Sequence, residues 1–157
     1  MTSARAAAAA IPTRTDHFET PAAMVAALRP DEPVYCVDRQ AVTDAARRFV
    51  GLFPGRVLYA VKCNPLPLFL DALREGGIDH FDTASMAEIE LIGGRYPDAG
   101  CHFMHPVKSP QAIRRAYDAF GVRHFVLDEF GELDKMAAVL GEDRRDAVAV
   151  VRLATPS

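Results

Sequence analysis

Short runs rich in valine, isoleucine, leucine and phenylalanine recur about every 22 residues along this chain. Five of these runs are predicted strands, at Val57–Val61, His80–Asp82, Cys101–Met104, His124–Leu127 and Ala147–Leu153. Each interval has the length of a compact strand, turn, helix and turn, and the segments between the strands have helical patterns. No sequence repeat accompanies this spacing. The sequence therefore predicts an α/β fold built on a parallel sheet.

The segments between the strands contain recognisable helix-end residues. Thr20-Pro21 and Ser109-Pro110 each place a capping residue before a proline at the first helical position. Asp38 is predicted to begin a helix that ends at Gly51, and Asp128 is predicted to begin one that ends at Gly141. A third helix is predicted over Leu66–Leu73, ended by Gly76-Gly77. A further short strand is predicted at Val34–Val37, ahead of the helix that Asp38 caps.

Successive strand-and-helix units fit two architectures, an open doubly wound sheet or the first part of an eight-stranded barrel. A complete (β/α)8 TIM barrel usually takes about 250 residues. With 157 residues this chain is too short to close one, so a barrel here would be incomplete, with about five strands. We divide the chain into an N-terminal arm with a short helix, residues 1–32, and a partial barrel domain, residues 33–157.

The composition excludes several classes of partner. The formal net charge of -3 and the pI near 5.9 argue against nucleic acid, because phosphate backbones are bound by clustered lysine and arginine. No run approaches the roughly 20 apolar residues that a membrane span requires, so no membrane partner is expected. The three cysteines, Cys36, Cys63 and Cys101, form no CxxC pair, which indicates neither a metal site nor a disulfide framework and favours a cytoplasmic location.

Polar residues follow the predicted strands at their carboxyl ends, where the reactive groups of parallel β/α folds gather. In chain order these are Lys62, Asp82 with Ser85 and Glu88, His105 with Lys108, Asp128, and Arg152. An ammonium at the end of a buried strand is partly desolvated, which favours the neutral amine that attacks a carbonyl. We predict this role for Lys62; a lysine that extends into solvent is the alternative.

The segment Tyr59-Ala60-Val61-Lys62-Cys63-Asn64 resembles the cofactor-lysine motif of the fold-type III pyridoxal-phosphate-dependent decarboxylases, the family of ornithine and diaminopimelate decarboxylase. The resemblance implies a TIM barrel of the alanine racemase-like type followed by a β-rich domain. It also implies pyridoxal 5'-phosphate as the cofactor, held as a Schiff base on Lys62. Further segments match in the same order, so the resemblance covers roughly residues 33–155.

Three more site residues follow from this resemblance. Phe81-Asp82-Thr83-Ala84-Ser85 resembles the second barrel strand, which implies that Asp82 and Glu88 lie in or near the cofactor pocket. Val151-Arg152-Leu153 resembles the fifth strand, which implies that Arg152 lies close to the cofactor ring. Ser85 and Glu88 also form a capping-box pattern, so the role of Glu88 stays open between the two. His105 is expected to be structural.

The implied activity is the decarboxylation of a basic amino acid, a small-molecule substrate. Cys63, where diaminopimelate enzymes more often have alanine, and the segment His105-Pro106-Val107-Lys108 favour ornithine, with putrescine as the product, in polyamine biosynthesis. Diaminopimelate or lysine decarboxylation is an alternative. A non-catalytic relative that binds the cofactor or has a regulatory role is another.

The 157 residues contain no counterpart of the family's glycine-rich phosphate loop, cofactor-stacking histidine or C-terminal β domain. We therefore expect a fragment or split subunit that acts as a homodimer or with a complementing C-terminal half. An unclosed sheet has two open edges, which favour association. The polypeptide alone is expected to be poorly stable or oligomeric.

Overall fold

The computed structural model describes residues 16–141 and 146–155. The chain divides into two units, Met1–Val37 and Asp38–Ser157, which we describe separately. The part of the predicted N-terminal arm that precedes residue 16 lies outside the described residues. Across 16–141 and 146–155, no helix combines the length and apolar character needed to cross a membrane.

The first unit contains one helix, α1, over Pro21–Leu28 within its described residues. Thr20 caps this helix as predicted, because its side chain accepts a hydrogen bond of 3.1 Å from the backbone N–H of Ala23. The strand predicted at Val34–Val37 is wrong: these residues lie outside any strand, and Tyr35 is 96% exposed. A short apolar run forms a strand only beside a neighbour that satisfies its backbone groups, and no described strand pairs with it.

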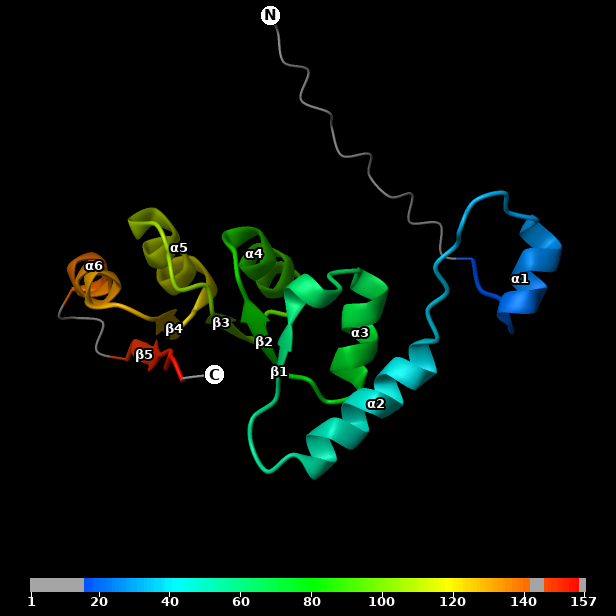
Figure 1. The fold of residues 1–157 in the computed structure, drawn as a ribbon, viewed down its shortest axis with the longest axis horizontal. Helices are drawn as coiled ribbons and strands as arrows, with labels where there is room; N and C mark the ends of the chain where they lie inside the picture. Colours follow the sequence, from blue (N-terminus) through cyan, green and yellow to red (C-terminus); the bar gives the residue numbers. More distant parts are fainter. Residues whose placement is uncertain (1–15, 142–145, 156–157) are drawn as a thin grey trace, which may run out of the picture. The chain divides into compact units, whose positions relative to one another are not determined.

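The second unit is built on a five-stranded parallel sheet (Figure 1). Its strands are β1 (Leu58–Ala60), β2 (His80–Thr83), β3 (Gly100–Phe103), β4 (His124–Leu127) and β5 (Val148–Val151). Each strand lies beside the next one in sequence, in the order β1-β2-β3-β4-β5. A doubly wound sheet reverses its strand order at a switch point. The unbroken order therefore selects the partial barrel over the doubly wound alternative.

The five strands of this sheet are confirmed, with differences at their ends. β4 has the predicted bounds, whereas β3 lies one residue earlier and β5 is shorter at both ends than predicted. The largest change in local structure is at the end of β1. Val61, predicted to close that strand, instead begins a single turn of 3-10 helix, η1, over Val61–Cys63.

Helices separate successive strands, and α3 to α6 lie along one side of the sheet in Figure 1. The helices of this unit are α2 (Arg39–Leu52), α3 (Pro67–Glu75), α4 (Met86–Arg95), α5 (Pro110–Phe120) and α6 (Phe130–Leu140). Asp38 and Ser109 cap α2 and α5 as predicted, each accepting a backbone N–H from three residues ahead. Gly76 and Gly141 end α3 and α6, also as predicted.

Two predicted helix boundaries are wrong. α2 continues through Gly51, because the N–H of Phe53 still reaches the carbonyl of Phe49 at 2.9 Å and a helical glycine costs only about 1 kcal/mol. Asp128 does not cap α6: the N-cap is Glu129, whose side chain makes no capping bond. Short-range spacing could not distinguish these neighbouring acids, because either could precede the helix.

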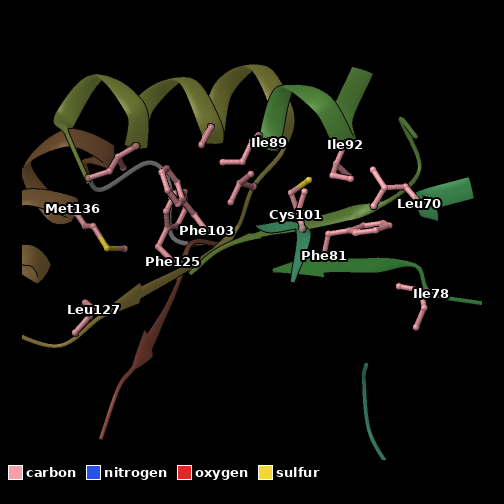
Figure 2. Packing of buried hydrophobic residues seen from close by; sticks show 14 of the residues in the cluster. Leu70, Ile78, Phe81, Ile89, Ile92, Cys101, Phe103, Phe125, Leu127 and Met136 are labelled. Carbon is pink, nitrogen blue, oxygen red and sulfur yellow. The ribbon is translucent and has the colours of Figure 1, made fainter. Parts of the chain in front are cut away.

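The hydrophobic core lies between the sheet and its helices (Figure 2). From the strands, Phe81, Phe103 and Phe125 each enter this core with at most 3% of their surface exposed. From the helices come Leu70, Ile89, Ile92, Ile113 and Met136. Side chains alternate between the two faces of a strand. Residues next to the phenylalanines, including Asp82 and His102, therefore belong to the opposite face, which would line the interior of a closed barrel.

Candidate cofactor site at the carboxyl ends of the strands

Lys62 lies at the carboxyl end of β1, on the η1 turn, and the residues around it fix that turn. Val61 is fully buried and anchors it in the core. The hydroxyl of Tyr59 donates to the carbonyl of Asn64 at 3.4 Å, and Asn64 Oδ1 accepts the N–H of Leu66 at 3.1 Å. Tyr59, Val61 and Asn64 therefore stabilise the turn that carries Lys62.

The side chain of Lys62 is exposed. The sequence predicted a partly desolvated ammonium at the end of a buried strand, and this part of the prediction is wrong. β1 is an edge strand that pairs only with β2, and its own residues are only half-buried. An amine at the end of an edge strand remains hydrated because no described element covers it.

Asp82 lies beside this turn, on the second strand. Its Cα pairs with that of Ala60 in the parallel register, which brings the carboxyl end of β2 next to η1. Burial raises the pKa of the Asp82 carboxyl; the nearby ammonium of Lys62 opposes that shift, and the carboxylate of Glu88 adds to it. The structure therefore brings Lys62, Asp82 and Glu88 into one electrostatic group.

Glu88 stabilises the loop between β2 and α4 through hydrogen bonds. Its Oε2 accepts the backbone N–H of Ala84 at 2.9 Å, and its Oε1 accepts the hydroxyl of Ser85 at 3.4 Å. Ser85 Oγ in turn accepts the N–H of Glu88 at 3.3 Å and caps α4. Both carboxylate oxygens are thus engaged in a capping network, which is the structural role that the sequence left open.

Arg152 lies apart from the group formed by Lys62, Asp82 and Glu88. It follows β5, where its backbone N–H donates to the carbonyl of Leu127 at 2.8 Å, and its side chain is exposed. β5 and β1 are the two edges of the sheet, with β2, β3 and β4 between them. The open sheet does not bring Arg152 together with Lys62.

Lys108 is buried, although the sequence placed it among the residues that project from the rim. Its ammonium donates to the carbonyls of Val126 at 2.5 Å, Pro106 at 3.0 Å and His105 at 3.1 Å, and lies 3.0 Å from Glu132 Oε1. Burial lowers the pKa of Lys108, against the opposing effect of Glu132. This cation holds the loop after β3 against the end of β4.

Glu132 is the residue of this rim that sequence reasoning missed. Its side chain is 3% exposed; it accepts the backbone N–H of Lys108 at 3.1 Å and also pairs with Lys135 at 2.5 Å. Although burial alone would raise the pKa of Glu132, hydrogen bonds from Lys135 and Lys108 hold it below its ordinary value. The only sequence signal was an i, i+3 charge pair on a predicted helix, which usually marks an exposed face.

His105 has a local role. Its ring nitrogen Nδ1 lies 2.8 Å from the carbonyl of Val107, two residues ahead, and its side chain is exposed. The contact stabilises the turn that leads to Lys108, in keeping with the structural role expected from the sequence.

Comparison with known proteins places these observations in a family. Residues 39–156 match the family model described as pyridoxal-dependent decarboxylase, pyridoxal binding domain. The chain is 40% identical to lysine/ornithine decarboxylase of Selenomonas ruminantium over 96 residues, which are 60% of this chain and 24% of that protein. It is 42% identical over 62 residues to the chloroplastic ornithine decarboxylase of Nicotiana glauca, covering 39% of this chain and 14% of the relative.

Solved structures give the same result. Lysine decarboxylase of S. ruminantium superposes with a TM-score of 0.70 at 28% identity, covering 89% of this chain and 36% of that one. The arginine decarboxylase of Paramecium bursaria Chlorella virus, bound to agmatine, superposes with a TM-score of 0.70 at 27% identity, covering 83% and 34%. The chain thus spans about a third of the length of these solved relatives. The family-model match from residue 39 to residue 156, on a sheet with this strand order, shows that the chain belongs to the pyridoxal-dependent decarboxylases, in the part that forms their pyridoxal-binding domain.

Proposed function

We propose that this chain is the amino-terminal part of a pyridoxal-phosphate-dependent decarboxylase of basic amino acids, with ornithine as substrate and putrescine as product. Membership of the family supports the cofactor and the reaction class. Relatives named as lysine/ornithine, ornithine and arginine decarboxylases support a basic amino acid as the substrate. Such a reaction contributes to polyamine biosynthesis, and we place it in the cytoplasm, where the free thiols of Cys36, Cys63 and Cys101 would stay reduced.

The observation that carries this proposal is the difference in burial and bonding among the three lysines of the sequence. Lys108 has 0% of its side chain exposed and has four oxygen partners. Lys135 is ion-paired with Glu132 and donates to the carbonyl of Lys108 at 2.7 Å. Among the described residues, none forms a hydrogen bond or ion pair with Lys62, and its side chain is exposed. Lys62 therefore offers the accessible side-chain amine that an aldehyde cofactor requires.

The residues around Lys62 fit the proposed cofactor. Bound pyridoxal phosphate would supply an electron-accepting ring that allows carbon dioxide to leave an amino acid. Lys62 Nζ would hold the cofactor and must first lose a proton. Asp82, the carboxyl group coupled to that ammonium, would help to position the amine beside the cofactor.

The other two predicted site residues have supporting parts in this proposal. Glu88 would keep the loop after β2 in place through its bonds to Ala84 and Ser85, rather than touch the substrate directly. Arg152 would present a fixed cation to the cofactor ring once β5 and β1 are brought round by the rest of a barrel. We propose that the remaining parts come from a complementing C-terminal half or from the second subunit of a homodimer.

Trapping with borohydride tests the role of Lys62. The chain is mixed with pyridoxal phosphate at neutral pH and reduced, and pyridoxyl-lysine is located by mass spectrometry of its peptides. We expect the label on Lys62 in the folded chain. In urea the three lysines should label equally. Lys62→Arg should abolish the site-specific label, and Lys135→Arg, a matched control, should leave it unchanged. Equal labelling of Lys62 and Lys135 in the folded chain would remove the cofactor role.

Reconstitution tests the reaction itself. The chain is co-expressed with a polypeptide that covers the remaining part of a solved relative, and release of carbon dioxide is measured separately with ornithine, lysine, arginine and diaminopimelate. Fastest release from ornithine supports the proposal. Fastest release from lysine or diaminopimelate would select the alternative substrates. Labelling of Lys62 without release from any of them would select the non-catalytic relative that binds the cofactor.

A further inference from the structure

A row of three histidines crosses the sheet on the face opposite the phenylalanine core. His80, His102 and His124 lie on the neighbouring strands β2, β3 and β4, each one residue before a core phenylalanine. The Cα atoms of His102 and His124 are register partners. His102 is 5% exposed, and the other two are half-buried. Neither the family match nor the proposed reaction assigns this row a role.

The rings of the row are in contact. His80 Nδ1 lies 3.1 Å from His102 Nε2, with ring centroids 5.2 Å apart. The centroids of His102 and His124 are 4.5 Å apart. His80 reaches across the sheet because its register partner on β3 is Gly100: a Cβ at that position would lie 2.2 Å from His80 Nδ1. The glycine thus leaves the space that the first imidazole occupies.

This geometry can hold only one proton between His80 and His102. Two ring nitrogens 3.1 Å apart form a hydrogen bond when one carries the proton and the other accepts it. A protonated histidine has an N–H on both nitrogens. If both rings are protonated, two N–H groups face each other, and the bond becomes a repulsion between two cations. The hydrogen bond between His80 and His102 can therefore form at neutral pH but not when both rings are protonated.

The charged groups near the row do not compensate for added protons. Arg56, before β1, and Arg74, on α3, both disfavour a charge on His80, and only Asp79 favours it. For His102 the neighbours are His124, His80 and Arg56, all of which disfavour charge. The adjoining register positions are apolar in β1 and β5, at Leu58 and Val148. Asp82, the register partner of His102, interacts instead with Lys62 and Glu88.

Burial, together with these neighbours, lowers the pKa of His102 to about 4, and burial also lowers the pKa of His80. An unfolded histidine titrates near 6.5. Between these values the unfolded chain binds more protons than the folded chain, so stability must fall as the pH falls from about 6.5 towards 4. Among the described residues, no group of three or more histidine, cysteine, aspartate or glutamate side chains is arranged to hold a metal ion.

We propose that His80, His102 and His124 form an acid-sensitive latch that holds β2 to β3 and β4 at neutral pH and releases them when both His80 and His102 are protonated. β2 also carries Asp82 of the candidate site, and the next residue, Thr83, is bonded to β3 because its Oγ1 donates to the carbonyl of His102 at 2.7 Å. Release of the latch therefore loosens the strand that presents Asp82. This role is independent of the proposed decarboxylase function.

Equilibrium unfolding in urea, followed by circular dichroism at several pH values between 6.5 and 5, tests the latch, with EDTA present throughout. With a folded pKa of about 4 and an unfolded pKa near 6.5, His102 alone should lower the folding equilibrium constant about 15-fold between pH 6.5 and pH 5. His102→Gln, which keeps a hydrogen-bonding amide but cannot be protonated, should remove most of that loss. His105→Gln, a control outside the row, should keep it. An unchanged stability in the native chain, or an equal loss in His102→Gln, would overturn the proposal.

Hydrogen exchange provides a second readout in the unmodified chain, which applies even if a variant fails to fold. After correction for intrinsic rates, the amides between β2 and β3, including Gly100 and Met104, should lose protection at pH 5 before those between β4 and β5, including Arg152. Uniform loss over all strands, or retained protection between β2 and β3, would contradict a latch at this position.

Discussion

The buried pair of Lys108 and Glu132 provides the sharpest stability prediction. Glu132→Gln keeps the size of the side chain and removes its charge, so the buried ammonium of Lys108 loses the carboxylate that it contacts. Removing one partner of a buried pair costs about 3–5 kcal/mol. Lys108 keeps its three carbonyl acceptors, so we place the cost near the lower end of that range, about 3 kcal/mol.

Lys108→Met should cost less than Glu132→Gln. Glu132 would still be paired with Lys135 at 2.5 Å, so no buried charge is left alone, and the loss comes from the carbonyls that have no donor, about 2 kcal/mol. The double variant should cost at least about 1 kcal/mol less than the sum of the two single variants, because the two residues are in direct contact. Urea unfolding at pH 7, monitored by circular dichroism, measures these free energies of unfolding.

The exposed pair of Glu90 and Arg115 is the matched control. Its side chains are 44% and 57% exposed, so Glu90→Gln should change the free energy of unfolding by less than about 1 kcal/mol. If Glu132→Gln is no more destabilising than Glu90→Gln, or if the double variant is simply additive, then Lys108 and Glu132 are not a buried, coupled pair.

Three further predictions concern the face that carries the candidate site. Gly100→Ala should destabilise the chain by about 1–3 kcal/mol, because the added Cβ meets the His80 ring, and His80→Ala should relieve that cost in the double variant, as urea unfolding will show. Ser85→Ala should cost about 1 kcal/mol through the lost cap of α4, seen as a lower unfolding midpoint. Asp82 has a raised pKa in the folded chain. Its protonated carboxyl therefore contributes stability at low pH, and this contribution is lost as the pH rises through the folded-state pKa of Asp82. Asp82→Asn should therefore raise the unfolding midpoint more at pH 7 than at pH 4, close to the unfolded pKa of an aspartate, which a pH series of thermal melts measures.

Much of the sheet could be predicted because its signals are local. β4 has the predicted bounds, since His124–Leu127 is a short apolar run that follows a helix ended at Gly121, where φ is 65°. The capping residues Asp38 and Ser109 act where they were predicted, because each needs only its own next turn. The false strand at Val34–Val37 shows the limit of this approach: an extended run becomes a strand only when a partner is present.

The environment of the rim residues could not be predicted in the same way. Lys108 and Glu132 are 24 residues apart, and their burial depends on how the loop after β3 packs on α6, which no local pattern contains. The exposure of Lys62 depends on β1 being an edge, a property of the whole sheet. By contrast, the proximity of Lys62 and Asp82 followed from one rule, that neighbouring parallel strands end on the same side.

The two edge strands of the sheet each lead to one predicted site residue, so strands added at these edges would affect both the fold and the site. Lys62 follows β1 and Arg152 follows β5, so the outermost strands each carry one predicted site residue. Both side chains are exposed, and both strands pair on one side only. Any segment that adds strands to both edges would extend the sheet beside β1, which Lys62 follows, and beside β5, which Arg152 follows. The same segment would bring Arg152 and Lys62 to one rim, because strands in a closed barrel end on a common face. The sheet by itself keeps these two residues on opposite edges and leaves the Lys62 side chain exposed.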